Sequence, residues 1–380
     1  MRPQTTWLGI GVFLLLLAPC WAASAFGAAP KSVSPLELGA SAPDFTLPGV
    51  DGKTYRLADF AAAKVLVFIF TCNHCPTAQA YEDRLVQLHA DFQGRGVALV
   101  AISPNDPLAV RLDELGYTDV NDSLEDMKIR ARDRGFTFPY LYDGDTQATS
   151  KAFGALATPH VFLFDAQRKL CYQGRIDDSE VGVVKSHDTR NAIEALLAGQ
   201  AVPVATTRVF GCSTKWSDKR SSAVESLAKW NAEEVSVQTI DTASVGKLAR
   251  NDSPNLRLIN VWATWCAPCV RELPELVTIN RMYRKRKFEL ITISLDDPKE
   301  REAVLKCLRE NHVSSTNHIF ESDDRDQLAE ALDKQWPGPV PYTILVAPGG
   351  KILYRKHDTI DPLELKKAIA DFLGRTYASR

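Results

Sequence analysis

The hydrophobic pattern begins the same structural unit twice along the chain. Two runs rich in β-branched and bulky apolar residues stand out, Val65–Phe70 and Leu256–Trp262. Such runs are typical of strands buried on both faces of a sheet. Each run is followed by apolar positions at helical spacing, over 78–92 in the first half and up to about Tyr283 in the second. The pattern therefore predicts a buried strand leading into a helix in each half.

Both halves continue with the same kinds of element. The first half continues with a strand at 97–102, an insert at 104–140 that contains a helix at 124–134, a short helix at 146–153, strands at 161–164 and 170–173, and a helix at 191–197. The second half continues with a strand at 288–293, helices at 299–311 and 326–332, strands at 343–346 and 352–354, and a helix at 362–372. This repeat predicts an α/β protein of two tandem domains, each a central mixed sheet flanked by helices. We expect the first domain at 36–216, a linker helix at 217–234 and the second domain at 235–380.

The N-terminal residues have the pattern of a secretory signal peptide. Met1-Arg2 is a short positive start, an apolar run covers 7–18, and small residues follow up to Ala29. We therefore expect a signal peptide over 1–29 and an exported protein in the periplasm or cell envelope. A lipid anchor at Cys20 and a retained N-terminal anchor remain open alternatives.

Composition narrows the classes of partner. The formal net charge is −2, so bulk charge favours neither a nucleic-acid partner nor an anionic membrane surface. Membrane contact is expected only through the N-terminal segment. Eight cysteines in 380 residues are too sparse for a disulfide scaffold, and four of them form two C-x-x-C pairs. No glycine pattern for nucleotide binding is present, so we expect no organic cofactor and a protein electron donor.

The two C-x-x-C pairs are the strongest chemical signal. Cys72 and Cys75 follow the first buried strand, and Cys266 and Cys269 follow the second. At a helix start, unpaired N–H groups and the helix dipole favour the thiolate, which is the nucleophile. A second cysteine one turn later can then resolve a mixed disulfide. This predicts Cys72 and Cys266 as attacking thiols and Cys75 and Cys269 as resolving thiols.

Two prolines support this redox interpretation. Pro159 and Pro341 each precede a strand in their own half. A cis proline there would place backbone beside the cysteines and leave a hydrogen-bonding edge for a substrate peptide. The alternative for paired C-x-x-C motifs is a structural zinc site with two ligands from each half.

The second half resembles the exported, TlpA-like thiol–disulfide oxidoreductases of the thioredoxin superfamily. The resemblance rests on the motif Asn-Val-Trp-Ala-Thr-Trp-Cys-Ala-Pro-Cys at 260–269, Glu-Leu-Pro at 272–274 and Val-Pro-Tyr at 340–342. Ordinary thioredoxins have an acidic residue at the position of Asn260. TlpA-like proteins often have an acid three residues after the second cysteine, which implies that Glu272 assists proton transfer for Cys269. A surface helix charge is the alternative for Glu272.

The first half resembles the peroxiredoxin-like branch of the same superfamily. The likeness rests on Ala-Pro-Asp-Phe-Thr-Leu at 42–47, Thr-Cys-Asn-His-Cys-Pro at 71–76, Thr-Pro-His at 158–160 and Gly-Cys-Ser at 211–213. Peroxiredoxins have a threonine three residues before the reactive cysteine, but that position is Cys72 for Cys75 and Ile69 for Cys72. This departure favours dithiol exchange with protein thiols and disulfides, with thiol peroxidase chemistry as the alternative.

The residues between the cysteines distinguish the two sites. His74 can become a cation beside Cys72, which makes the first pair more oxidising than the second. This suggests an electron relay from the second pair to the first, and two independent modules are the alternative. A further alternative is copper delivery, in which Cys72, Cys75, His74 and His160 would converge as Cu(I) ligands.

The remaining cysteines give weaker signals. Cys307 and Cys171 lie in a helical and a strand pattern, respectively, and are expected to be core residues. Cys212 lies in a turn-like stretch and could be a third thiol that meets the first pair.

Overall fold

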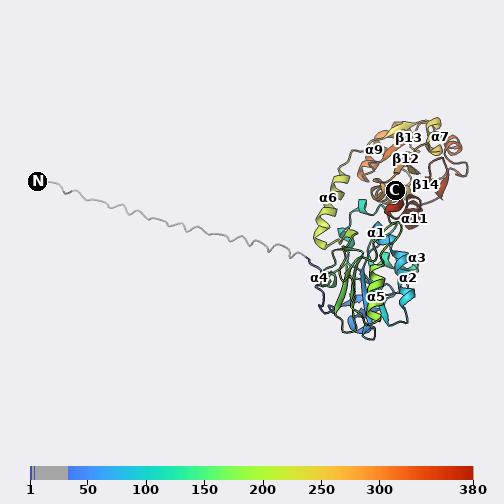
Figure 1. Cartoon of the computed structure of the whole chain (residues 1–380). Helices are drawn as coiled ribbons and strands as arrows, with labels where there is room; N and C mark the ends of the chain where they lie inside the picture. Colours follow the sequence, from blue (N-terminus) through green and yellow to red (C-terminus); the bar gives the residue numbers. More distant parts are fainter. Residues whose placement is uncertain (2–3, 5–32, 380) are drawn as a thin grey trace. The chain divides into compact units, whose positions relative to one another are not determined.

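The computed structural model describes residues 33–379 together with Met1 and Gln4. The signal peptide predicted at 1–29, with Cys20, falls outside the described residues except at Met1 and Gln4. Over 33–379, the helices are all too short or too polar to cross a membrane. The described chain contains two central sheets, one in each half of the sequence (Figure 1).

The first half is built on a five-stranded sheet in the order β5-β4-β3-β7-β8. All strands of the first half, including the separate pairs β1-β2 and β6-β9, are β1 (Thr46–Pro48), β2 (Thr54–Arg56), β3 (Val65–Phe70), β4 (Val97–Ser103), β5 (Tyr140–Tyr142), β6 (Ala157–Thr158), β7 (His160–Phe164), β8 (Leu170–Gly174) and β9 (Cys212–Ser213). Its helices are α1 (Pro76–Ala80), α2 (Glu82–Phe92), α3 (Leu124–Arg134), α4 (Ala148–Phe153) and α5 (Asp188–Leu197). In the sheet, β3 is parallel to β4 and antiparallel to β7, which pairs antiparallel with β8.

The second half repeats this arrangement in a six-stranded sheet, β10-β13-β12-β11-β14-β15. Its strands are β10 (Gln238–Ile240), β11 (Leu256–Trp262), β12 (Phe288–Ser294), β13 (Thr316–Phe320), β14 (Tyr342–Val346) and β15 (Ile352–Lys356). Its helices are α6 (Arg220–Asn231), α7 (Thr242–Arg250), α8 (Ala267–Tyr283), α9 (Arg301–Glu310), α10 (Arg325–Leu332) and α11 (Pro362–Leu373). The central strand β11 is parallel to β12 and antiparallel to β14, as β3 is to β4 and β7.

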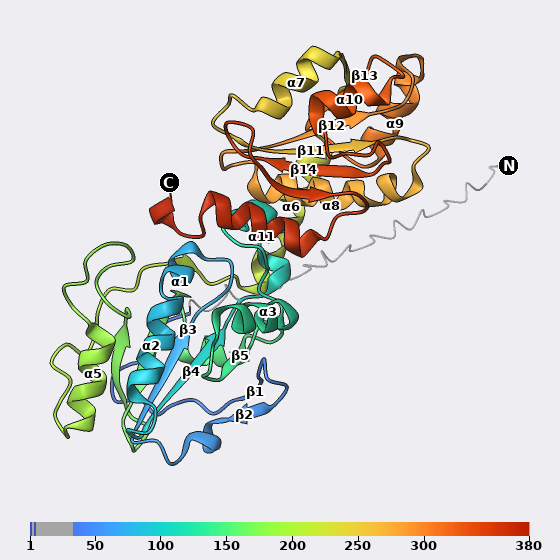
Figure 2. The ribbon, with the colours of Figure 1, turned by 90° about the vertical axis from the view of Figure 1, so that its right-hand side faces the viewer.

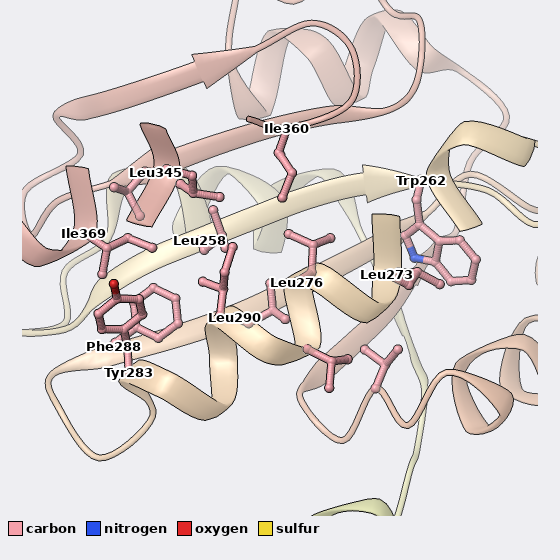
Figure 3. Close-up of a cluster of buried hydrophobic side chains, with 14 of the residues drawn as sticks. Leu258, Trp262, Leu273, Leu276, Tyr283, Phe288, Leu290, Leu345, Ile360 and Ile369 are labelled. Atoms are coloured by element: carbon pink, nitrogen blue, oxygen red, sulfur yellow. The ribbon is translucent and has the colours of Figure 1, made fainter. Parts of the chain in front are cut away.

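Each sheet is covered by helices on both faces, which explains why the central strands are apolar throughout. In the second half, α7 and α10 cover one face, and α8 and α11 cover the other (Figure 2). Alternate residues of β11 point to opposite faces, so Leu258 packs under α8 whereas Ile259 packs on the α7 side. Leu276 and Tyr283 on α8 face Leu258 and the neighbouring strand β12 (Figure 3). The tandem α/β architecture expected from the sequence is confirmed.

Several predicted bounds differ from the observed ones. The helix expected at 78–92 is split at Tyr81, where the backbone N–H bonds the carbonyl three residues back and tightens the turn. Strands β5, β10 and β13 and helix α7 were not predicted. The first three are short, and β13 carries polar residues in its middle, so their apolar pattern is weak.

A segment of the first half packs into the second half. We call residues 105–122 the bridging segment. Its Val110 and Leu115 belong to the same buried cluster as the α8 side of the second core. The hydroxyl of Tyr283, the last residue of α8, donates to the carbonyl of Thr118 at 2.7 Å, and Arg286 donates to the carbonyl of Gly116 at 2.8 Å. The bridging segment therefore joins the C-terminal end of α8 to the first half.

Candidate active site

The first C-x-x-C pair lies between the end of β3 and the start of α1. Cys75 is the N-cap of α1, and Pro76 is its first helical residue. A proline is well suited to that position, because its fixed φ matches the helix and its missing N–H is not needed there. Both sulfurs are free thiols, and Cys72 and Cys75 are only 3% and 0% exposed. The pair is therefore a buried dithiol in this structure.

The residue before the first predicted proline contacts both thiols. Thr158 Oγ1 lies 3.1 Å from Cys72 Sγ, and the thiol of Cys75 donates to the Thr158 carbonyl at 3.3 Å. The Thr158-Pro159 peptide bond is cis. Backbone beside this proline thus lies against the cysteines, in the arrangement that the sequence suggested.

A buried carboxylate organises the residues between the two cysteines. Asp122 Oδ1 accepts hydrogen bonds from the backbone N–H groups of Asn73 and His74, at 2.8 and 3.2 Å. Its Oδ2 lies 2.6 Å from Nδ1 of His74 and accepts from Asn105 at 2.8 Å. All four side chains are buried. Asp122 is a site residue that the sequence did not reveal, because it is far from the motif along the chain and precedes a helix N-cap.

These contacts set the charge of His74. Burial alone lowers the pKa of this imidazole, but the Asp122 carboxylate outweighs burial and raises the pKa above its usual value. For the carboxyl group of Asp122, burial raises the pKa, but the charge and hydrogen bond of His74 lower it by more, so the pKa lies below its usual value. The pair is therefore stabilised as imidazolium and carboxylate.

The two thiols have opposite acidities. Burial raises the pKa of Cys75, but hydrogen bonds from Cys212 and Cys72 and the charge of His74 bring it well below the usual thiol value. The pKa of Cys72 is well above that value because of burial, its hydrogen bond to Cys75 and the nearby Asp122 charge. The lower pKa of the pair therefore lies at Cys75, whereas the sequence predicted Cys72 as the attacking thiol. Pro76 is the sequence signal for this, since it starts the helix at Cys75.

The second C-x-x-C pair is a disulfide. Cys266 is the N-cap of α8, and its Sγ is bonded to Cys269 with a Cα–Cα distance of 5.3 Å. The backbone N–H of Cys269 also donates to Cys266 Sγ at 3.3 Å. Trp265, just before the pair, is 55% exposed, and the Val340-Pro341 peptide bond is cis. Here the first cysteine heads the helix, as the sequence predicted.

Glu272 lies buried one turn beyond Cys269. Its Oε1 accepts from the side chain of Asn260 at 2.9 Å, and its Oε2 accepts from the backbone N–H of Ile360 at 3.1 Å. Burial raises the pKa of this carboxyl, and the two hydrogen bonds only partly offset that effect. The surface-charge alternative for Glu272 is therefore wrong.

The metal-site alternatives do not fit the geometry. A zinc ion shared by both pairs would need Cys266 and Cys269 as free thiolates, but these two are bonded to each other. Within the described chain, the ligand-type atoms within 4.8 Å of one another belong to Cys72, His74 and Asp122. Neither Cys75 nor His160 belongs to that group, so the expected set of copper ligands is wrong.

His160 lies on β7 and packs on the ring of Phe162, with ring centroids 4.3 Å apart. Among the described residues, no hydrogen-bond partner contacts its Nδ1, and burial lowers its pKa to about 4. A neutral core histidine fits these observations.

The remaining cysteines differ in their surroundings. Cys171 and Cys307 are partly buried and pack against the edges of the first and second cores, respectively. Cys212 packs against the buried group formed by Cys72, Cys75 and Ala78. The third thiol thus meets the first pair.

Comparison with known proteins identifies the family. The family model described as AhpC/TSA matches twice, over residues 38–173 and 230–355. The chain belongs to the AhpC/TSA family. The two matches coincide with the two sheets and therefore support tandem thioredoxin-like domains.

Individual relatives cover only part of the chain. Thiol-disulfide oxidoreductase ResA of Oceanobacillus iheyensis is 29% identical over 28% of this chain and 53% of its own length. A Mycobacterium tuberculosis protein described as a candidate peroxiredoxin, Rv2521, is 30% identical over 33% of this chain and 68% of its own length. The chain spans about half the length of the ResA relatives. A solved Geobacillus kaustophilus protein of uncharacterised function is 39% identical, covering 47% of this chain and 92% of that one, with a TM-score of 0.42.

Proposed function

We propose that this AhpC/TSA protein is an exported thiol–disulfide oxidoreductase that exchanges electrons with protein thiols and disulfides through two C-x-x-C sites. The observation that carries the proposal is the repeated geometry. In each half a C-x-x-C pair follows the central strand, and a cis proline precedes the neighbouring antiparallel strand. The ResA relatives, which are named thiol-disulfide oxidoreductases, support the same chemistry.

The two sites differ in ways that suit different steps. The disulfide of the second site lies beside the exposed ring of Trp265, which offers an apolar surface to a partner protein. The cysteines of both sites are buried, with Cys266 and Cys269 only 6% and 0% exposed, and the acidic member of the first pair is Cys75. A thiol of low pKa is a good leaving group in disulfide exchange, so a disulfide that involves Cys75 is readily reduced. The first site is thus suited to the more oxidising role.

The arrangement of α8 favours separate sites over a direct relay within one chain. Cys266 caps the N-terminal end of α8, whereas the bridging segment contacts its C-terminal end at Tyr283. A helix of 17 residues is about 25 Å long at 1.5 Å per residue. We therefore propose that each pair meets its own protein partners, and that any electron transfer between the pairs passes through another molecule.

The test uses the full chain and measures reduction of insulin disulfides by dithiothreitol. We expect that replacing one pair (Cys72→Ser/Cys75→Ser or Cys266→Ser/Cys269→Ser) leaves part of the catalysed rate, and that replacing all four abolishes it. The matched control is Cys171→Ser/Cys307→Ser, which removes two thiols outside the sites and should keep the full rate. A four-serine variant as active as the parent would contradict the proposed function.

Export is tested separately. The proposal rests on the positive start, apolar run and small residues of the first 29 residues. Expression in a bacterial host followed by fractionation should place the protein in the periplasm or envelope. Terminal sequencing should then show whether the segment is removed. Recovery of the full-length chain only in the cytosol would contradict export.

A peroxidase activity is the second candidate, and the acidity of Cys75 is the observation that favours it. A buried thiolate at this position could attack a peroxide oxygen, forming a sulfenic acid and releasing an alcohol or water. The position three residues before it is Cys72, where peroxiredoxins have a threonine. We expect peroxide consumption by the reduced protein to be lost in Cys75→Ser and retained in Cys266→Ser/Cys269→Ser if this activity exists.

A further inference from the structure

Cys212 is brought to the first site by a short strand pair. β9 pairs antiparallel with β6, and the register places Cys212 opposite Thr158, the residue that contacts both Cys72 and Cys75. The preceding Gly211 has a φ of +145°, and a Cβ there would lie 2.2 Å from the Thr158 carbonyl oxygen. Only glycine allows so close an approach, so the chain is built to bring residue 212 to this point.

Cys75 lies close to both Cys72 and Cys212. The three cysteines pack together with Ala78 in one cluster, and the backbone N–H of Cys212 donates to Cys75 Sγ at 3.4 Å. Interactions with the thiols of Cys212 and Cys72 also lower the pKa of Cys75. The three cysteines differ in access to solvent. Cys72 and Cys75 are buried, whereas Cys212 is partly exposed.

This difference bears on how a protein partner reaches the site. Thiol–disulfide exchange requires the attacking sulfur to reach one sulfur of the disulfide directly. A disulfide between Cys72 and Cys75 would join two buried residues, whereas a disulfide between Cys75 and Cys212 would include one residue that is only partly buried. We propose that Cys212 is a third redox residue of the first half, forming a disulfide with Cys75 and receiving the attack of client thiols.

The steps balance as follows. A client thiolate attacks Sγ of Cys212, the Cys75–Cys212 bond breaks, and Cys75 leaves as its thiolate. A second client thiolate then attacks the client sulfur of the mixed disulfide and releases Cys212, so the client forms a disulfide. The client loses two electrons and the Cys75–Cys212 pair gains them. The same steps in reverse, with a protein disulfide as oxidant, restore the bond. Cys72 can also attack Cys75 within the bond, which frees Cys212 and transfers the disulfide to the buried pair without net electron change.

The electrostatics of the site agree with this order. The pKa of Cys75 is lowered, which makes it a good leaving group, whereas hydrogen bonding to Cys75 together with burial raises the pKa of Cys212. Attack at Cys212 therefore expels the better leaving group. The inference rests on the proposed disulfide-exchange function and adds the residue that a client meets.

The experiment uses the full chain with Cys266→Ser/Cys269→Ser, which removes the second C-x-x-C pair. The reduced protein is treated with oxidised glutathione, quenched in acid, alkylated and mapped by mass spectrometry without reduction. With Cys72→Ser added, we expect a linked Cys75–Cys212 peptide. With Cys75→Ser added instead, we expect glutathione on Cys212 rather than on Cys72. Cys171→Ser is the matched control and should reproduce the parent pattern.

Two outcomes would overturn the inference, and they differ in what they imply for the function. The first outcome is glutathione accumulating on Cys72 in the Cys75→Ser variant, with Cys212→Ser and Cys212→Ala variants that form the Cys72–Cys75 disulfide at the parent rate. This outcome would contradict the redox role of Cys212 but leave the proposed exchange function intact. The second outcome is a parent protein that exchanges with neither glutathione nor insulin disulfides, which would contradict both the role of Cys212 and the proposed exchange function. If the inference holds, both Cys212 variants oxidise about tenfold more slowly or worse.

Discussion

Nδ1 of His74, which lies between the two cysteines of the first pair in sequence, is 2.6 Å from Oδ2 of Asp122, the last residue of the bridging segment, and both side chains are buried. The carboxylate keeps the imidazole charged, and that charge lowers the pKa of Cys75. Asp122 also raises the pKa of Cys72. One carboxylate therefore lowers the pKa of Cys75, through His74, and raises the pKa of Cys72.

Replacing Asp122 with asparagine should bring the two thiols closer in acidity. In Asp122→Asn, His74 loses the charge that keeps it protonated, so the pKa of Cys75 should rise while that of Cys72 falls. We expect alkylation of Cys75 in the reduced protein near pH 6 to slow by about tenfold, the equivalent of one pKa unit. Site-resolved mass spectrometry measures the rate. The control is Asp83→Asn at an exposed carboxylate of α2, and equal rates in the two variants would contradict the assignment.

The same pair predicts how stability depends on pH. Asp122 has a lowered pKa, so its contribution is present above its usual value of 3.8 and is lost as the pH falls through the lower folded value. His74 has a raised pKa, so its contribution is present below 6.5 and is lost as the pH rises through the higher folded value. Urea unfolding at pH 5 should therefore show His74→Gln less stable than the parent by about 3 kcal/mol. The difference should shrink above neutral pH, and a constant difference would contradict a charged pair.

The sequence predicted those elements whose signals are local. Strand β11 and helix α3 have the predicted bounds, since β11 is a long apolar run and α3 has a capping serine at 123 and a left-handed glycine at 135. The C-x-x-C motifs were recognisable for the same reason, because four residues carry the whole pattern.

What the sequence did not reveal depends on contacts between distant segments. Asp122 is brought to His74 across 48 positions by a segment without a repeating apolar pattern. Which thiol of the first pair lies at the helix start depends on a single turn, and only Pro76 places that start at Cys75. Cys212 lay in a stretch too short to be predicted as a strand, and its pairing with Thr158 follows from tertiary structure alone.

Glu272 should accept the proton of the Cys269 thiol when that thiol attacks the mixed disulfide between Cys266 and a substrate. Glu272→Gln keeps the hydrogen-bond acceptor for Asn260 but cannot take a proton. We expect reduction of insulin disulfides by the Cys72→Ser/Cys75→Ser protein to fall by about a hundredfold when this change is added, with loss of the ionisation that belongs to Glu272 from the pH profile. An unchanged pH profile would contradict the proton-transfer role.

Gly211→Ala should separate Cys212 from the first pair without removing a thiol. The new Cβ would meet the Thr158 carbonyl oxygen at 2.2 Å, so β9 must move away from β6. Gly199→Ala is the matched control, because Gly199 also has a positive φ of +69° but nothing within 4 Å of the added Cβ. We expect the control to lose about 1 kcal/mol of unfolding free energy from backbone strain alone, and Gly211→Ala to lose more. The linked Cys75–Cys212 peptide expected in the Cys72→Ser background should then be lost, and its retention would show that β9 had not moved.

Leu115→Ala tests whether the bridging segment is part of the second core. Leu115 is 5% exposed and lies in the buried cluster of α8, whereas Leu108 in the same segment is 64% exposed. Truncating a buried leucine leaves a cavity and costs about 3 kcal/mol, while the same change at an exposed position costs about 0.5 kcal/mol or less. Leu115 belongs to the first half in sequence but packs in the second core, so its truncation should weaken the contact between the two halves. Urea unfolding should then show two transitions in Leu115→Ala and the parent profile in Leu108→Ala. Equal stability of the two variants would mean that the bridging segment does not pack into the second core in solution.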